Sequence, residues 1–181
     1  MPKARLLVIG LGQEIRGDDA VGLETVRLWQ AEYPETARRT DLVVESAPLP
    51  GLSLLSFLEC AEAAILVDAM QSGAPAGTVR VLERDDLAGF GGDAQSAHGW
   101  GVAETLAMAE TLYKEKMPQR LVLLAVEAGN MDLGKPMSTM VKAALPSVAK
   151  QLQALVLDIL AAEVQPPADA QLKPWPQPVS Q

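Results

Sequence analysis

Three polar side chains stand beyond apolar stretches of the chain, where they could form a metal site. Asp19 follows the glycines Gly10 and Gly12, Asp68 closes an apolar run, and His98 is the only histidine. Two carboxylates and an imidazole supply hard oxygen and borderline nitrogen ligands, and they leave other coordination positions open. These residue types therefore indicate a divalent metal site, provided that the fold brings them together.

Each of these residues also has a simpler structural interpretation. Asp19, next to Asp18, could complement the dipole of a helix N-terminus. Asp68 could cap the turn that follows its strand, and His98 could hydrogen-bond locally within a loop. The two interpretations differ in whether the three side chains meet in space.

The elements that must position these residues alternate between strands and helices. Runs of branched apolar residues predict strands, and apolar residues at helical spacing predict helices. Strands joined by helices pair in parallel, so their carboxyl ends meet at one sheet edge, where open α/β sheets bind ligands. The expected strands are 5–10, 42–45, 64–68, 78–82 and 121–126, and the expected helices are 18–33, 51–63, 99–116 and 136–163.

The sum of these elements is a single α/β domain over residues 1–164. It has three layers, a mostly parallel twisted sheet of about five strands with helices on both faces. Segment 78–82 is expected as an edge strand or as a hairpin-like partner of segment 64–68, and the strongly apolar segment 121–126 is expected to be central. Pro146 divides segment 136–163 into two short helices or kinks a single one. The proline-rich residues 165–181 predict a disordered tail.

The amino-acid composition limits the possible binding partners of the protein and its cellular compartment. The 181 residues are 49% hydrophobic, which is enough for one core, and the formal net charge of -8 without a basic face argues against a nucleic-acid partner. The single cysteine, Cys60, excludes an internal disulfide and favours a reducing compartment, and we expect it to be buried as a small hydrophobe. The apolar runs are too short for a membrane span or a signal segment. We therefore expect a cytoplasmic monomer without a membrane partner.

The glycines after the first strand leave one further alternative open. Gly10-Leu11-Gly12 is similar to the start of a dinucleotide-binding turn, but Ile15 stands where a third glycine is expected. Asp18 and Asp19 would also place negative charge where a pyrophosphate must bind. A nucleotide-binding α/β domain is therefore the less favoured alternative.

Three ordered motifs resemble those of a known enzyme family. The segment Gly10–Gly22 reads Gly-Leu-Gly-Gln-Glu-Ile-Arg-Gly-Asp-Asp-Ala-Val-Gly, Ile65–Ala69 ends in an acidic strand terminus, and Ser96–Gly101 forms a histidine loop. All three resemble signatures of the nickel–iron hydrogenase maturation endopeptidases. Leu133–Pro136 and Leu145-Pro146 resemble the family's C-terminal segment, so the resemblance covers residues 4–163.

This resemblance implies a function for the three polar residues. Asp19, Asp68 and His98 fall on the family's metal-binding and catalytic positions, in an enzyme classed with the aspartyl proteases. The family removes a C-terminal extension from the hydrogenase large-subunit precursor once nickel is inserted, so nickel would come with the substrate, although other divalent metals can occupy the site. A bound cation could polarise the scissile carbonyl or activate a water with an aspartate as base, and both roles stay open. The alternative is a non-catalytic module that checks the precursor for nickel through the same residues.

Two positions depart from the family pattern. Gln13 stands where the family usually has asparagine, and Glu45-Ser46-Ala47-Pro48 stands where an Asp-Gly-Gly/Ser-Thr type of segment is common. The second segment is expected to border the substrate cleft. Both departures leave the metal trio intact, and they bear on which large subunit is cleaved.

Overall fold

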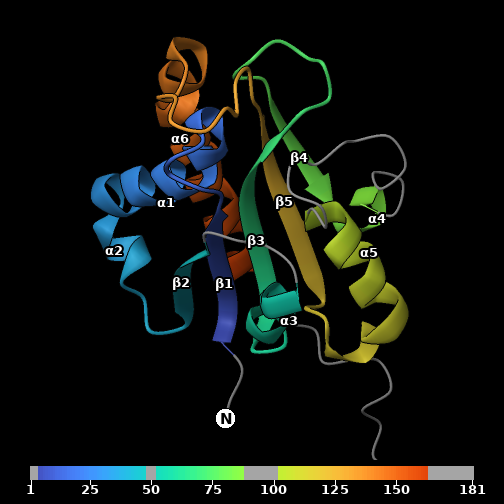
Figure 1. Cartoon of the computed structure of the whole chain (residues 1–181). Coiled ribbons are helices and arrows are strands. Elements are labelled where there is room, and N and C mark those ends of the chain that lie inside the picture. Colours follow the sequence, from blue (N-terminus) through green and yellow to red (C-terminus); the bar gives the residue numbers. More distant parts are fainter. Residues whose placement is uncertain (1–3, 48–51, 88–101, 163–181) are drawn as a thin grey trace, which may run out of the picture.

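A computed structural model of the chain describes residues 4–47, 52–87 and 102–162, and it contains one five-stranded sheet (Figure 1). The strand order is β2-β1-β3-β5-β4, in which β4 alone runs antiparallel to its neighbour. The sheet is thus mostly parallel, which confirms the predicted fold class. The strands are β1 (Ala4–Leu11), β2 (Leu42–Ala47), β3 (Ala61–Met70), β4 (Val79–Glu83) and β5 (Arg120–Glu127).

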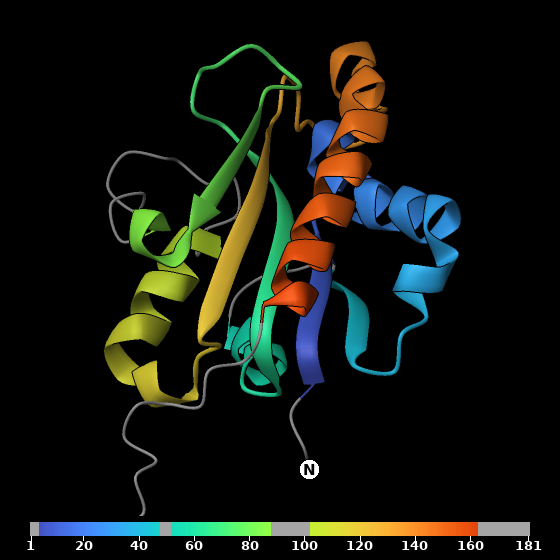
Figure 2. The same ribbon diagram turned by 180° about the vertical axis from the view of Figure 1, so that it is seen from behind.

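Helices cover both faces of this sheet, as Figures 1 and 2 show. Because successive side chains of a strand point to opposite faces, Leu6 of β1 belongs to the core beneath α1 and α6, whereas Leu7 belongs to the core beneath α3 and α5. The helices are α1 (Val21–Glu32), α2 (Pro34–Ala37), α3 (Leu52–Leu58), α4 (Arg84–Leu87), α5 (Val102–Leu112) and α6 (Thr139–Ala161), with 3₁₀ turns η1 (Gly17–Ala20) and η2 (Lys114–Lys116).

The turn between β1 and α1 lies very close to the sheet. A Cβ atom on Gly22 would lie 2.2 Å from the carbonyl oxygen of Val67 and 2.3 Å from that of Leu11. Gly12 has φ +124°, and a Cβ atom there would lie 1.8 Å from the carbonyl oxygen of Asp19. Glycine at these two positions therefore allows the turn that carries Asp19 to fold against the ends of β1 and β3.

The predicted helix over 51–63 is too long. The helix α3 ends at Leu58, and Ala61 and Ala63 already belong to β3, in parallel register with Ala4 and Leu6 of β1. Pairing with β1 overrides the intrinsic helix preference of alanine. Cys60 falls between the two elements and is exposed, so the expectation of a buried cysteine was wrong.

The last two strands also differ in detail from the prediction. Segment 79–83 is an edge strand, as expected, but β4 pairs with β5, and β3 rather than β5 occupies the centre of the sheet. The segments beyond residue 162, including the predicted tail 165–181, lie outside the described residues.

The helix α6 is a single helix that continues through Pro146. Pro146 is exposed, so the carbonyl left without an intrahelical partner can bond to water. By length and composition α6 could also cross a membrane, contrary to the expectation that no segment would suffice. In the fold, its residues Val148, Leu152 and Val156 are buried in the core shared with β1 and α1. The indole Nε1 of Trp29 in α1 donates to Oε1 of Gln153 at 2.8 Å, which ties the two helices together.

Candidate active site

Asp19 lies in the turn η1, just before α1, and its side chain is buried. The backbone N–H of Gln13 donates to Asp19 Oδ2 at 2.8 Å and thereby fixes the carboxylate at the end of β1. Because this donor is a backbone group, glutamine at position 13 makes the bond as well as asparagine would. The departure from the family pattern at this position therefore leaves the orientation of Asp19 unchanged.

Asp68 lies toward the carboxyl end of the central strand β3, in register with Ala125 of β5. Its Oδ1 accepts a hydrogen bond from the N–H of Ala69 at 2.9 Å. Burial raises the pKa of Asp68 to about 7, and the negative charge of nearby Asp19 contributes to the same shift. The fold thus brings together the two carboxylates that the sequence places at neighbouring strand ends.

The chemistry of this pair suits a cation. Two carboxylates that repel each other in a partly buried setting are stabilised by a positive charge between them, and oxygen ligands bind divalent metals. A carboxyl group that titrates near neutral pH can also accept and return a proton. His98 lies outside the described residues, and within them no three histidine, cysteine, aspartate or glutamate side chains gather as a metal cluster. Asp19 and Asp68 are therefore the two members of the predicted trio whose positions the structure describes.

Asp18, next in sequence to Asp19, has a different role. It is fully buried, and its Oδ2 accepts the N–H groups of Gly129 at 2.8 Å and Asn130 at 2.9 Å, while its Oδ1 accepts the N–H of Ser138 at 2.6 Å. Burial by itself would raise the pKa of Asp18, but these hydrogen bonds, led by that of Ser138, lower it below its ordinary value. Asp18 therefore fastens the turn that carries Asp19 to the segment between β5 and α6.

Glu127, at the end of β5, holds a second loop in the same manner. Its Oε1 accepts the N–H groups of Ser72 and Gly73, and its Oε2 accepts the Ser72 hydroxyl, each at 2.8 Å. These bonds fix the loop that follows Met70, the last residue of β3. Sequence reasoning missed both anchoring roles, because the donors lie 54 to 120 residues away in the chain.

The segment that departs from the family pattern after the second strand lies at this same sheet edge. Glu45, Ser46 and Ala47 end β2 and pair in parallel with the last residues of β1, and Pro48 lies outside the described residues. The segment is thus beside the turn that leads to Asp19.

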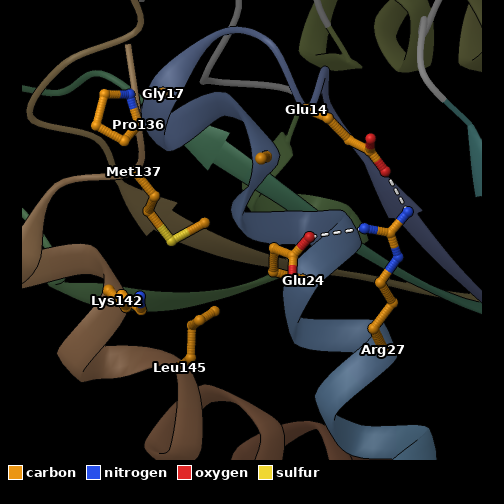
Figure 3. Close-up of a pocket in the computed structure, with 9 residues that line it drawn as sticks. Glu14, Gly17, Glu24, Arg27, Pro136, Met137, Lys142 and Leu145 are labelled. Atoms are coloured by element: carbon orange, nitrogen blue, oxygen red, sulfur yellow. Dashed lines mark hydrogen bonds and ion pairs between the residues drawn. The ribbon is translucent and has the colours of Figure 1, made fainter.

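A cleft of about 300 Å³ opens beside the turn η1, between the N-terminal part of α1 and the beginning of α6 (Figure 3). The α6 side combines apolar side chains with Lys142, and the α1 side carries Glu24 and Arg27. The lining residues are Glu14, Gly17, Ala20, Glu24, Arg27, Pro136, Met137, Lys142 and Leu145.

The sheet and the acidic pair at its carboxyl edge are those of an open-sheet α/β enzyme, since such sheets bind ligands where the strands end. A family model described as hydrogenase maturation protease matches residues 42–155, which is more than half of the chain. The chain therefore belongs to the hydrogenase maturation protease family, and its relatives in that family are proteases.

Individual relatives agree with this assignment. The hydrogenase expression/formation protein HupD of Rhizobium leguminosarum bv. viciae is 28% identical over 148 residues, which cover 81% of this chain and 71% of HupD. The fold is that of the hydrogenase maturating endopeptidase HybD from E. coli, with a TM-score of 0.72 at 20% identity over 85% of this chain and 93% of HybD. A maturation protease HybD from Thermococcus kodakarensis gives a TM-score of 0.66 at 22% identity, over 84% of this chain and 99% of that protein.

Proposed function

We propose that the protein removes the C-terminal extension of a nickel–iron hydrogenase large-subunit precursor after nickel insertion, in the cytoplasm. Family membership supports the proteolytic activity. The observation that carries the site assignment is the juxtaposition of Asp19 and Asp68 at the ends of neighbouring parallel strands, where their charges interact. In this proposal nickel arrives as part of the substrate.

The two aspartates fit a substrate-borne cation. Asp19 is oriented by the backbone of Gln13, and Asp68 is held by the N–H of Ala69, so both carboxylates are set before the substrate arrives. Such pre-organisation reduces the ordering that binding requires. His98 is proposed as the third ligand, on the resemblance of its loop to the family's histidine motif. The cation would supply Lewis-acid polarisation of the scissile carbonyl or of a water molecule.

The proposal is tested by processing of the purified precursor. The protein is mixed with nickel-loaded and nickel-free precursor, and loss of the C-terminal extension is followed by mass spectrometry. We expect cleavage of the nickel-loaded form alone. Cleavage of both forms at equal rates would overturn nickel recognition, and nickel-dependent binding without cleavage would identify a checking module instead of a protease.

A further inference from the structure

The cleft beside η1 is not used by the carboxylate pair. Gly17 and Ala20, the first and last residues of η1, belong to its lining, so the cleft adjoins the turn that carries Asp19. Figure 3 shows Met137 and Leu145 on one side and Glu24 and Arg27 on the other. A substrate that reaches Asp19 can therefore extend into this cleft.

Some charged residues of the cleft lining form ion pairs within the described chain, and one does not. Arg27 forms ion pairs with both Glu14 and Glu24, so the two carboxylates share one guanidinium and have an ion-pair partner within the cleft. Lys142, in the first turns of α6, is exposed and forms no ion pair with any residue that the structure describes. Within the described part of the chain, the α6 side of the cleft thus offers a positive charge that has no ion-pair partner and lies next to apolar side chains.

Large apolar side chains near the cleft also reach into solvent. Ile15 is 62% exposed and Leu133 is 68% exposed. The N–H of Gly134 donates to the carbonyl oxygen of Ile15 at 2.7 Å, so the two loops that carry these side chains are joined. The same two loops supply Glu14 and Pro136 to the lining of the cleft, so exposed apolar side chains occur on the loops that border it.

We propose that this cleft binds an extended segment of the precursor polypeptide that carries a large apolar side chain and a carboxylate. The apolar side chain packs between Met137 and Leu145, and the carboxylate pairs with Lys142. The cleft volume of about 300 Å³ is at the lower end for ligand pockets and suits one or two side chains rather than a nucleotide. This inference rests on the proposed function, because it names how the same substrate is held.

A charge reversal with a matched control tests the carboxylate contact. Lys142→Glu and Lys150→Glu make the same change on exposed positions of α6, but Lys142 alone lines the cleft. With nickel-loaded precursor, Lys142→Glu is expected to raise KM about 5-fold at unchanged kcat, because an attractive charge becomes repulsive. Lys150→Glu is expected to leave both parameters at the wild-type values.

An analogous pair of variants tests the apolar contact. Met137→Ala removes a side chain of the lining, whereas Met140→Ala truncates an exposed methionine that is not part of it. Met137→Ala is expected to raise KM about 5-fold by the loss of buried apolar area, which converts to about 1 kcal/mol of binding free energy. Urea unfolding of all four variants shows whether each remains folded.

Binding of the precursor, measured by surface plasmon resonance, separates this inference from the proposed function. Weaker binding of Lys142→Glu than of Lys150→Glu, in a protein that does not cleave, would retain the docking surface and overturn the proposed protease activity. Equal KM values and equal affinities for these two variants, in a protein that cleaves, would overturn the docking surface alone. Substitution of single acidic residues of the precursor by lysine is expected to restore the affinity of Lys142→Glu at one position, and failure at every position would overturn the carboxylate contact.

Discussion

Two adjacent aspartates in one short turn illustrate opposite uses of a buried carboxylate. Asp18 has a lowered pKa because backbone N–H groups of Ser138, Asn130 and Gly129 outweigh the effect of burial. Asp19 faces Asp68 instead, and the pKa of Asp68 is raised by burial and by the charge of Asp19. The fold thus provides Asp18 with hydrogen-bond donors, whereas it places Asp19 close to Asp68, whose negative charge repels it.

The difference between them separates a carboxylate that serves stability from one that we propose to serve chemistry. A buried charge that accepts several N–H bonds stabilises the folded state and has little capacity left for a ligand. A buried pair of like charges destabilises the folded state unless a cation lies between the members. Strain of this kind is typical of functional sites.

The largest effect is expected from loss of the repelling pair. Asp68→Ala should reduce the rate of precursor processing by about 10³-fold or more, as when a member of a catalytic set is removed. The rate is measured by mass spectrometry on nickel-loaded precursor. Since Asp68 is not an anchor, the urea midpoint should not fall. Processing at the wild-type rate would show that Asp68 does not act in the reaction.

The second effect concerns the anchoring carboxylate. Asp18→Ala leaves three partly buried N–H groups without their acceptor and should lower the free energy of unfolding by about 3 kcal/mol. Urea unfolding measures this change. The isosteric Asp18→Asn, which keeps an acceptor oxygen, should lose less. Loss of under about 1 kcal/mol in Asp18→Ala would contradict the anchoring role.

The pKa of Asp68 gives a third prediction, on pH dependence. With the folded-state pKa at about 7 and the ordinary value at 3.8, the folded protein binds one more proton than the unfolded chain between these values. Asp68 therefore stabilises the fold fully below pH 3.8, and this contribution is lost as the pH rises through 7. Without divalent cations, Asp68→Asn should be more stable than the wild type at pH 8 by about 2 kcal/mol. The difference should shrink at pH 5, and an equal difference at both pH values would contradict the raised pKa.

The smallest effect is expected from exposed charges that already have partners of opposite sign. Arg27 pairs with Glu14 and Glu24 on the surface, and more than half of its side chain is exposed. Arg27→Ala should lower the free energy of unfolding by less than about 1 kcal/mol, because solvent and salt screen such pairs. The same urea assay in low and high salt measures it. If Arg27→Ala lowered the free energy of unfolding as much as Asp18→Ala does, the difference in exposure between Arg27 and Asp18 would not explain their contributions to stability.

The sequence predicts the repelling pair but not the anchor. Asp19 and Asp68 follow apolar strands, and parallel pairing of such strands brings their ends together, so local pattern and topology suffice. Asp18 has the local pattern of a helix N-terminus, yet its partners lie 111 to 120 residues away and are backbone groups without side-chain identity. Long-range pairing also explains the error at Ala61, where β1 draws a locally helical segment into the sheet.

The bonds of Asp18 also set the order in which the molecule can be completed during synthesis. The chain must be made through Ser138 before the last acceptor oxygen of Asp18 finds its donor. Contacts of such high sequence separation form late, after shorter loops have closed. On the ribosome, the turn that carries Asp19 therefore lacks its hydrogen bond to Ser138 until the segment leading into α6 has emerged. The geometry of Asp19 therefore requires translation beyond Ser138, and a nascent chain truncated before that residue carries the aspartates without this geometry.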